Sequence, residues 1–225
     1  MTDTASVLMN DLSVMIGMPT HRDIPAQTVG SLIQTVHRCN KLDIPLTVSM
    51  VLSGVVVNGR NDTLDEFLKS DCNRLFWIDS DMVWTPEQFV RLLALSKLRP
   101  VVGASYTAKI DQPTFFVKME DGPKRDDLGL ISVTGMGLGF TVITREVAEK
   151  LAANADVVED EISSRKLANV FRWDTIDGKR RGEDMAFFHD IIEMGYDVML
   201  DPDTHLGHIG TKEYRGKITD SGDFK

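Results

Sequence analysis

The amino-acid sequence predicts an α/β protein with a mostly parallel central sheet flanked by helices and a smaller mixed sheet. Over the first 107 residues, short apolar segments alternate with longer ones whose apolar residues recur at helical spacing. Such alternation is typical of parallel sheets covered by helices on both faces. The apolar run 75–78 is too short for a helix and ends in two carboxylates, as a buried central strand would. The length of 225 residues fits one large domain.

The expected elements of the first half follow from apolar periodicity and from turn residues. Thr85 and Pro86 have the residue types of a helix N-cap and first helical position. In chain order we expect a strand over 12–18 that Pro19 ends, a helix over 26–40, a strand over 44–52, a turn over 58–62 leading into a helix over 62–70 capped by Asn61 or Asp62, the strand 75–78, a helix over 86–97 and a strand over 101–106.

After residue 106 the periodicity changes to short extended runs, which predict the smaller mixed sheet. The glycines at 135, 137 and 139 do not match the dinucleotide-binding fingerprint, so we expect them to permit close backbone approach. The expected elements are strands at 115–119, 130–133 and 137–144, a helix over 145–151, a charged segment at 156–170, a polar loop over 171–181, an amphipathic helix from Glu183 to Gly195, a strand over 196–200, and a mobile tail over 211–225.

Composition limits the class of protein. The chain is 42% hydrophobic and 26% charged, as is usual for globular proteins. A net charge of −9 disfavours a general affinity for nucleic acid or anionic membranes. The first residues lack the pattern of a signal peptide, and no apolar stretch is long enough to span a bilayer. Cys39 and Cys72 have neither metal-knuckle nor redox spacing. We therefore expect a cytoplasmic protein without membrane insertion.

Asp79 and Asp81 are the main candidates for a metal site. They follow the central strand directly, and ligands bind outside the carboxyl ends of strands in such sheets. Alternation along an extended chain would point both carboxylates to one side, where they could share a hard divalent cation. An Asp-rich turn that caps the next helix is the alternative. Mutual repulsion of two adjacent carboxylates favours the metal interpretation.

Other candidates lie farther along the chain. Arg60 could bind a phosphate or the metal-site carboxylates, or be a solvated turn residue. Glu183 and Asp184 open the amphipathic helix, where acids also complement the helix dipole. One imidazole of the pair His205 and His208 could join the carboxylate site. The histidines at 21 and 37 are interpreted as surface or hydrogen-bonded residues rather than ligands. In the tail, Lys212 and Arg215 are available to close over an anion.

The order of these motifs resembles a compact GT-A fold glycosyltransferase, close to the family 2-type enzymes. The motifs are Pro19-Thr20, Arg60-Asn61, the Asp-x-Asp of Asp79-Ser80-Asp81, Gly182-Glu183-Asp184 before an apolar helix, and Leu206-Gly207-His208. The resemblance covers about residues 12–210. The Gln-x-x-Arg-Trp motif of processive polysaccharide synthases is absent, which speaks against processive synthesis.

The resemblance implies a single catalytic domain over 1–210, with a nucleotide-binding half at about 1–107 and an acceptor-binding half at about 108–210. The implied enzyme is a hexosyltransferase that uses Mn²⁺ or Mg²⁺ and a nucleotide-diphospho-sugar, with a UDP-sugar favoured. Asp81 and His208 would hold the metal, and Asp79 would reach it through water and touch the ribose. The implied donor-binding residues are Pro19, Thr20, Arg60, Asn61, Asp79, Ser80, Lys212 and Arg215.

The catalytic acids implied by the resemblance are Asp184 and Glu183. In an inverting enzyme one of them would take the proton of the acceptor hydroxyl. In a retaining enzyme the pair would position the donor sugar. The acceptor could be a glycan, a protein, a small molecule or a modified nucleic-acid base, and the net charge does not favour nucleic acid.

Two other functions compete with the transferase. The first is a haloacid dehalogenase-type phosphohydrolase, in which Asp79 would be the nucleophile. In that class the motif usually lies near the amino terminus and continues with Gly-Thr, whereas Met82-Val83 follows here. The second is a non-catalytic nucleotide-sugar-binding module, which would not need the intact acid pair.

Overall fold

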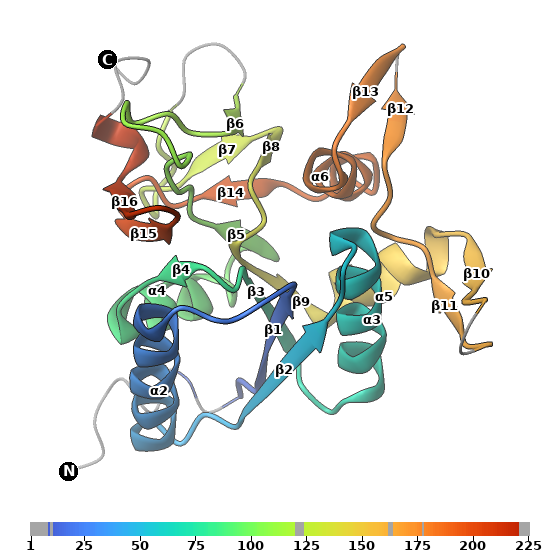
Figure 1. Cartoon of the computed structure of the whole chain (residues 1–225), viewed down its shortest axis with the longest axis horizontal. Helices are drawn as coiled ribbons and strands as arrows, with labels where there is room; N and C mark the ends of the chain where they lie inside the picture. The colour runs from blue at the N-terminus through green and yellow to red at the C-terminus, as the bar shows by residue number, and fades with distance from the viewer. Residues whose placement is uncertain (1–8, 10, 120–123, 162–163, 177, 221–225) are drawn as a thin grey trace.

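The computed structural model of the chain describes residues 9, 11–119, 124–161, 164–176 and 178–220 (Figure 1). A 7-stranded sheet forms its centre, with the strand order β2-β1-β3-β9-β5-β14-β7. Five of these strands run in one direction, and β9 and β7 run against them. The strands are β1 (Val14–Thr20), β2 (Leu46–Leu52), β3 (Arg74–Ile78), β5 (Val101–Gly103), β7 (Ile131–Val133), β9 (Phe140–Thr144) and β14 (Val198–Leu200).

The predicted mostly parallel sheet is confirmed, but the placement of two runs was wrong. The segments 130–133 and 137–144 were assigned to the smaller sheet, whereas β7 and β9 belong to the central one. Four consecutive residues of β9 are buried, because the strand lies between β3 and β5 and has a helix layer on each face. The remaining strands form small sheets: β4 (Met82–Val83) with β15 (Leu206–Ile209) and β16 (Glu213–Gly216), β6 (Val117–Lys118) with β8 (Gly135–Met136), β10 (Val157–Glu159) with β11 (Lys166–Ala168), and β12 (Asp174–Ile176) with β13 (Lys179–Arg181).

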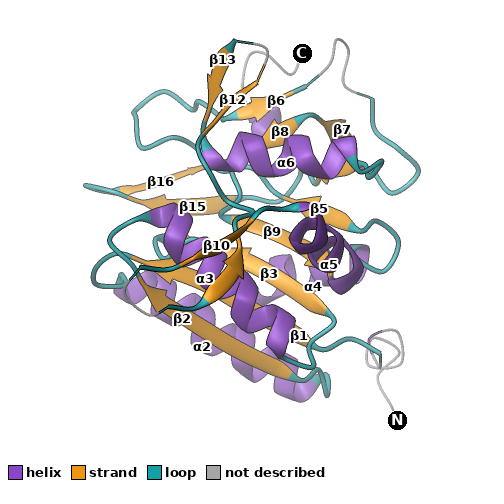
Figure 2. Cartoon of the chain, turned by 90° about the vertical axis from the view of Figure 1, so that its right-hand side faces the viewer, coloured by secondary structure: helices purple, strands orange, loops and turns teal. Residues whose placement is uncertain are grey.

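Two hydrophobic cores lie on opposite faces of the central sheet. Side chains alternate along a strand, so Phe76 and Ile78 of β3 face one core while Leu75 and Trp77 face the other. The first core is covered by α2 (Ala26–Lys41) and α4 (Pro86–Leu95). The second is covered by α3 (Val56–Lys69), α5 (Arg145–Asn154) and α6 (Glu183–Glu193) (Figures 1 and 2). Helices therefore flank both faces, as the alternating pattern predicts.

The helix starts were predicted well at α2 and α4. Thr85 caps α4 through a reciprocal pair of bonds with Gln88, and Pro86 is the first helical residue, as the sequence indicates. The predicted start of α3, at residue 62, was wrong, because the helix begins at Val56 and residues 58–62 lie inside it. Gly59 is not a turn residue. A Cβ there would lie 3.1 Å from Ser53 Cβ and 3.3 Å from Pro19 Cβ, so glycine allows this helix to pack closely on the strand ends.

Two further boundaries differ from the prediction. Strand β1 continues through Pro19 to Thr20, because its pairing with β3 stops at Gly17 and only the β2 side is paired beyond that point. Part of the expected mobile tail has regular structure, since β16 pairs with β15 and Ile218–Asp220 form a 3₁₀ turn. Residues 221–225 lie outside the described part. None of the described helices combines the length and apolar composition needed to cross a membrane.

Asn61 joins α3 to a segment that lies far away in the sequence. Its side chain accepts from Phe171 N at 2.8 Å and donates to Phe171 O at 2.9 Å. The Phe171 ring stacks on Phe187 of α6 with 4.8 Å between ring centroids. Asn61 thus satisfies both buried backbone groups of Phe171, and it ties α3 to the segment that precedes the β12–β13 hairpin.

We expect Asn61→Ala to lower the free energy of unfolding by about 2–4 kcal/mol, because two buried backbone groups would lose their partner. Asn61→Asp keeps the acceptor for Phe171 N and should cost less. Urea denaturation followed by circular dichroism measures both, with the exposed Asn154→Ala as the matched control. A loss below about 0.5 kcal/mol in Asn61→Ala would contradict this structural role.

Candidate active site

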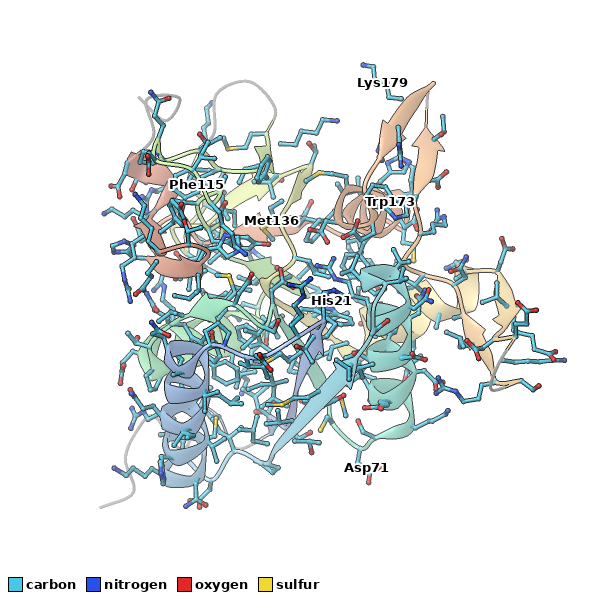
Figure 3. All side chains as sticks on the ribbon, viewed as in Figure 1. His21, Asp71, Phe115, Met136, Trp173 and Lys179 are labelled. Carbon is cyan, nitrogen blue, oxygen red and sulfur yellow. The ribbon has the colours of Figure 1, made fainter. Side chains whose placement is uncertain are left out.

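One cavity of about 510 Å³ opens where the carboxyl ends of the parallel strands β1, β2, β3 and β5 meet. Residues from each strand end line it, as expected for ligand sites in open α/β sheets. The start of α6 and strand β15 close its other sides. The lining residues are Pro19, Thr20, His21, Ser53, Gly54, Val56, Arg60, Asp79, Ser80, Asp81, Tyr106, Glu183, Asp184 and His208. In Figure 3, His21 lies near the middle of the molecule, and Asp71 lies at the opposite end of the sheet.

Arg60 connects the acidic residues of the cavity. Its guanidinium lies 3.3 Å from Asp79 Oδ1 and 3.8 Å from Glu183 Oε1, and it also pairs with Asp184. The side chain is only 4% exposed, so the charge is neutralised by these carboxylates rather than by water. The alternative of a solvated turn arginine is therefore wrong.

Asp79 is fixed on its other side by Tyr106. The phenol donates to Asp79 Oδ2 at 3.3 Å and accepts from Gly139 N at 3.3 Å. Burial, with a smaller effect of the Asp79 charge, raises the pKa of Tyr106, so the phenol keeps the proton that it donates. A Cβ at Gly139 would lie 2.8 Å from Asp79 Cγ and 2.9 Å from Tyr106 Oη. Glycine at 139 thus permits the close approach that the sequence predicts for this stretch.

Asp81 and His208 lie next to each other in the lining of the cavity. Asp79 and Asp81 share the cavity through a turn closed by Met82 N and Asp79 O at 3.1 Å, not through the extended alternation that we expected. His208 Nε2 lies 3.4 Å from Asp81 Oδ1, and His208 Nδ1 lies 2.8 Å from Thr107 O. A carbonyl oxygen only accepts, so Nδ1 carries a proton, and Nε2 is the ring nitrogen that faces Asp81. Metal-binding histidines are commonly oriented by such a backbone bond.

Lys109 also contacts Asp81, at the second carboxylate oxygen Oδ2. Burial alone would raise the pKa of Asp81, but hydrogen bonds from His208 and Lys109 outweigh burial and hold that pKa below its ordinary value. Asp81 therefore stays ionised at neutral pH. Lys109 extends from the segment that follows β5, whose carboxyl end lies at the same edge of the sheet as that of β3.

The charges of the cavity favour a bound cation. Four carboxylates and one guanidinium line it, and Lys109 adds one positive charge at the rim, which leaves an excess of negative charge. Carboxylate oxygen and imidazole nitrogen are ligands suited to Mn²⁺ or Mg²⁺. Within the described residues, however, no group of three or more His, Cys, Asp or Glu side chains is arranged to hold a metal ion. The residue types fit a divalent cation, and in this structure Lys109 contacts the Asp81 carboxylate that could bind one.

Three residues expected in the donor site lie outside the cavity. Asn61 is committed to Phe171, because its side chain leaves the helix on a different side from Arg60. Lys212 pairs with Asp111 at 2.5 Å, and Arg215 pairs with Glu213. Both line a separate cavity of about 170 Å³ formed with residues 107–113. The pairing of β16 with β15 holds them there, so they are not part of a tail that could close over the main cavity.

Sequence reasoning missed Tyr106 and Lys109. His21, interpreted as a surface or hydrogen-bonded residue, is exposed, and its Nδ1 lies 3.4 Å from Ser53 O at the edge of the cavity. A usable signal exists for the first two, since both follow β5, which ends at the same sheet edge as β3. The irregular segment 104–116 hides it, because no periodicity indicates which of its side chains turn back toward the sheet.

Comparisons with known proteins identify a fold but no close relative. No family model matches the chain, and no curated protein matches it. Among solved structures, A197 from STIV is 23% identical with a TM-score of 0.55, and the match covers 88% of this chain and 86% of that one. GalNAc-T7 with UDP, GalNAc and Mn²⁺ is 13% identical with a TM-score of 0.56, covering 89% of this chain and 44% of that one.

A third structure, the mannosyltransferase PcManGT from Pyrobaculum calidifontis in complex with GDP-Man and Mn²⁺, is 13% identical with a TM-score of 0.46, covering 85% of this chain and 55% of that one. The first two likenesses, at these identities, bear on fold alone. They agree with a large mostly parallel sheet, smaller sheets and helices on both faces. The chain has a GT-A-like α/β fold.

Proposed function

We propose that this protein is a metal-dependent glycosyltransferase that moves a sugar from a nucleotide-diphosphate donor to an acceptor hydroxyl. The observation that carries the proposal is the cavity at the strand ends. It gathers Asp79, Asp81 and His208 opposite the acid pair Glu183 and Asp184. The GT-A-like fold supports it, because the GalNAc-T7 structure with this fold holds UDP, GalNAc and Mn²⁺.

In this proposal the donor nucleotide lies along the ends of β1 and β2. Pro19 and Thr20 end β1, Ser53 and Gly54 follow β2, and all four line the cavity. These backbone and small polar groups suit a flat base and a ribose. Asp79 would accept a hydrogen bond from a ribose hydroxyl, because Arg60 and Tyr106 already fix its carboxylate in place. We favour a UDP-sugar as the donor.

Asp81 and His208 would hold the divalent cation, Mn²⁺ or Mg²⁺, with Asp79 reaching it through water. When bound, such an ion supplies Lewis-acid neutralisation of the charge that develops on the departing nucleoside diphosphate. The donor itself is anionic, and the cavity carries an excess of carboxylates. A diphosphate would be repelled from this cavity unless a cation accompanied it.

Glu183 and Asp184 would act on the acceptor side. Both stand in the first turn of α6, and Asp184 Oδ2 also accepts from Leu138 N at 3.3 Å. We assign Asp184 as the base that takes the proton of the acceptor hydroxyl while its oxygen forms the new bond to the anomeric carbon. The bond from that carbon to the diphosphate breaks in the same reaction. Glu183, farther from Arg60, would orient the acceptor.

We expect one nucleoside diphosphate among UDP, GDP, CDP and dTDP to raise the melting temperature only when Mn²⁺ is present. At a hundredfold excess over the dissociation constant, binding adds about 2.7 kcal/mol, or about 5–10 °C for a chain of this size. Asp81→Ala should abolish the shift. Asp127→Ala removes a carboxylate that is 81% exposed and lies outside the cavity, so it should leave the shift intact.

Other outcomes of this panel would point to other functions. Stabilisation by Mg²⁺ with beryllofluoride, and by no nucleotide, would indicate the phosphohydrolase with Asp79 as nucleophile. A nucleotide shift without turnover of any donor sugar would indicate a non-catalytic binding module. A shift that survives in Asp81→Ala would contradict the assigned cation ligand.

Asp184→Asn should lower the rate of nucleotide release from the donor sugar by about 10²–10⁴-fold, because the amide cannot accept the proton. Chromatography of released nucleotide measures the rate. The Mn²⁺-dependent melting shift should persist, since Asp184 would act on the acceptor. Glu193→Gln, an exposed change at the other end of α6, is the control. Unchanged release in Asp184→Asn would contradict its assignment as the base.

A further inference from the structure

Lys109 occupies an unexpected place beside the cavity. Its ammonium contacts Asp81 Oδ2, while Asp81 Oδ1 faces His208 Nε2 at 3.4 Å. The carboxylate proposed to hold a divalent cation is thus already paired with a positive charge of the chain itself. Lys109 does not line the cavity and is 39% exposed, so its side chain reaches Asp81 from the rim.

The backbone around Lys109 is arranged for this contact. A Cβ at Gly210 would lie 3.1 Å from Lys109 Cδ and 3.3 Å from Lys109 Cγ, so the aliphatic stem crosses directly over this glycine. Gly210 follows β15, and Ile209 N donates to Asp81 O at 2.8 Å. The end of β15 therefore does two things. Gly210 provides the surface on which the Lys109 stem rests, and Ile209 bonds to the backbone of Asp81, the ion-pair partner of Lys109.

An ordinary surface ion pair is the competing interpretation, and most such pairs contribute little. Lys212 and Asp111 provide a comparison within the chain, since their side chains are 59% and 85% exposed. Asp81 differs from Asp111, because it is 30% exposed, faces an imidazole and lines a cavity with excess negative charge. The pairing of Lys109 with Asp81 therefore affects which other cations can bind in this cavity.

We propose that Lys109 is a displaceable counter-ion that couples cation binding to nucleotide binding, an inference that rests on the proposed function. An ammonium and a divalent cation repel each other, so both cannot share the Asp81 carboxylate at close range. Cation binding displaces Lys109, whose flexible stem then lets the ammonium turn toward the diphosphate of the donor. Lys109 thus opposes the cation alone and favours the cation together with the nucleotide.

This role predicts effects of opposite sign, which a merely structural residue would not produce. Lys109→Met keeps the length of the stem and removes the charge. It should tighten binding of Mn²⁺ alone by about tenfold and weaken binding of UDP at saturating Mn²⁺ by about tenfold, each tenfold being about 1.4 kcal/mol. The coupling between the two ligands, which is reciprocal by linkage, should fall accordingly. Electron paramagnetic resonance of free Mn²⁺ and calorimetric titration of UDP, GDP, CDP and dTDP measure both affinities.

Two matched variants sharpen the test. Gly210→Ala keeps the ammonium but pushes the stem off its support, so it should shift both affinities in the same directions as Lys109→Met, by less. Lys166→Ala removes another exposed lysine, on β11 and outside the cavity, and should change neither affinity. Lys109→Arg keeps the charge and should retain most of the coupling.

The outcomes separate this inference from the function beneath it. If the wild-type protein binds a nucleoside diphosphate with Mn²⁺ but both affinities of Lys109→Met stay within twofold, or both weaken, the counter-ion role is wrong and the function stands. If the wild-type protein binds none of the four nucleotides with Mn²⁺, the proposed function is wrong and the coupling is wrong with it. Opposite shifts in Lys109→Met would support both.

Discussion

The buried guanidinium of Arg60 is the interaction on which the candidate site depends. It holds carboxylates that come from the end of β3 and from the start of α6, two segments separated by about a hundred residues. Without it, Asp79, Glu183 and Asp184, which are all partly buried, would repel one another. Arg60 lies near the start of α3, which begins at Val56 and packs through Gly59 onto Pro19 and Ser53 at the ends of β1 and β2.

The rest of the site is arranged around this centre by close approaches of backbone. Gly139 of the segment before β9 lets Tyr106 and Asp79 meet, and Gly210 after β15 lets Lys109 cross to Asp81. Charge then divides the cavity into two parts. Arg60 pairs with Asp79, Glu183 and Asp184, whereas Asp81 contacts Lys109 and the imidazole of His208. The cation is proposed to enter at this second part.

Local signals in the sequence were sufficient for the features that depend on neighbouring residues. The strand that precedes Asp79, the N-cap at Thr85, and the acidic first turn of α6 were all predicted. The sequence could not indicate features that depend on long-range contacts. Examples are β9 inserted between β3 and β5, and Asn61 bonded to the backbone of a residue 110 positions away. Gly59 was mistaken for a turn signal, since a glycine serves turns and close packing equally well.

The measurement that tests the central claim most directly is a crystal structure of the chain with Mn²⁺ and the nucleoside diphosphate that it binds. Anomalous scattering would locate the metal without reference to any assignment of residues. We expect one Mn²⁺ peak between Asp81 and His208 Nε2, a diphosphate on that ion, a base near Pro19 and Thr20, and Lys109 turned away from Asp81. A nucleotide bound elsewhere, or a metal that does not contact Asp81, would contradict the account.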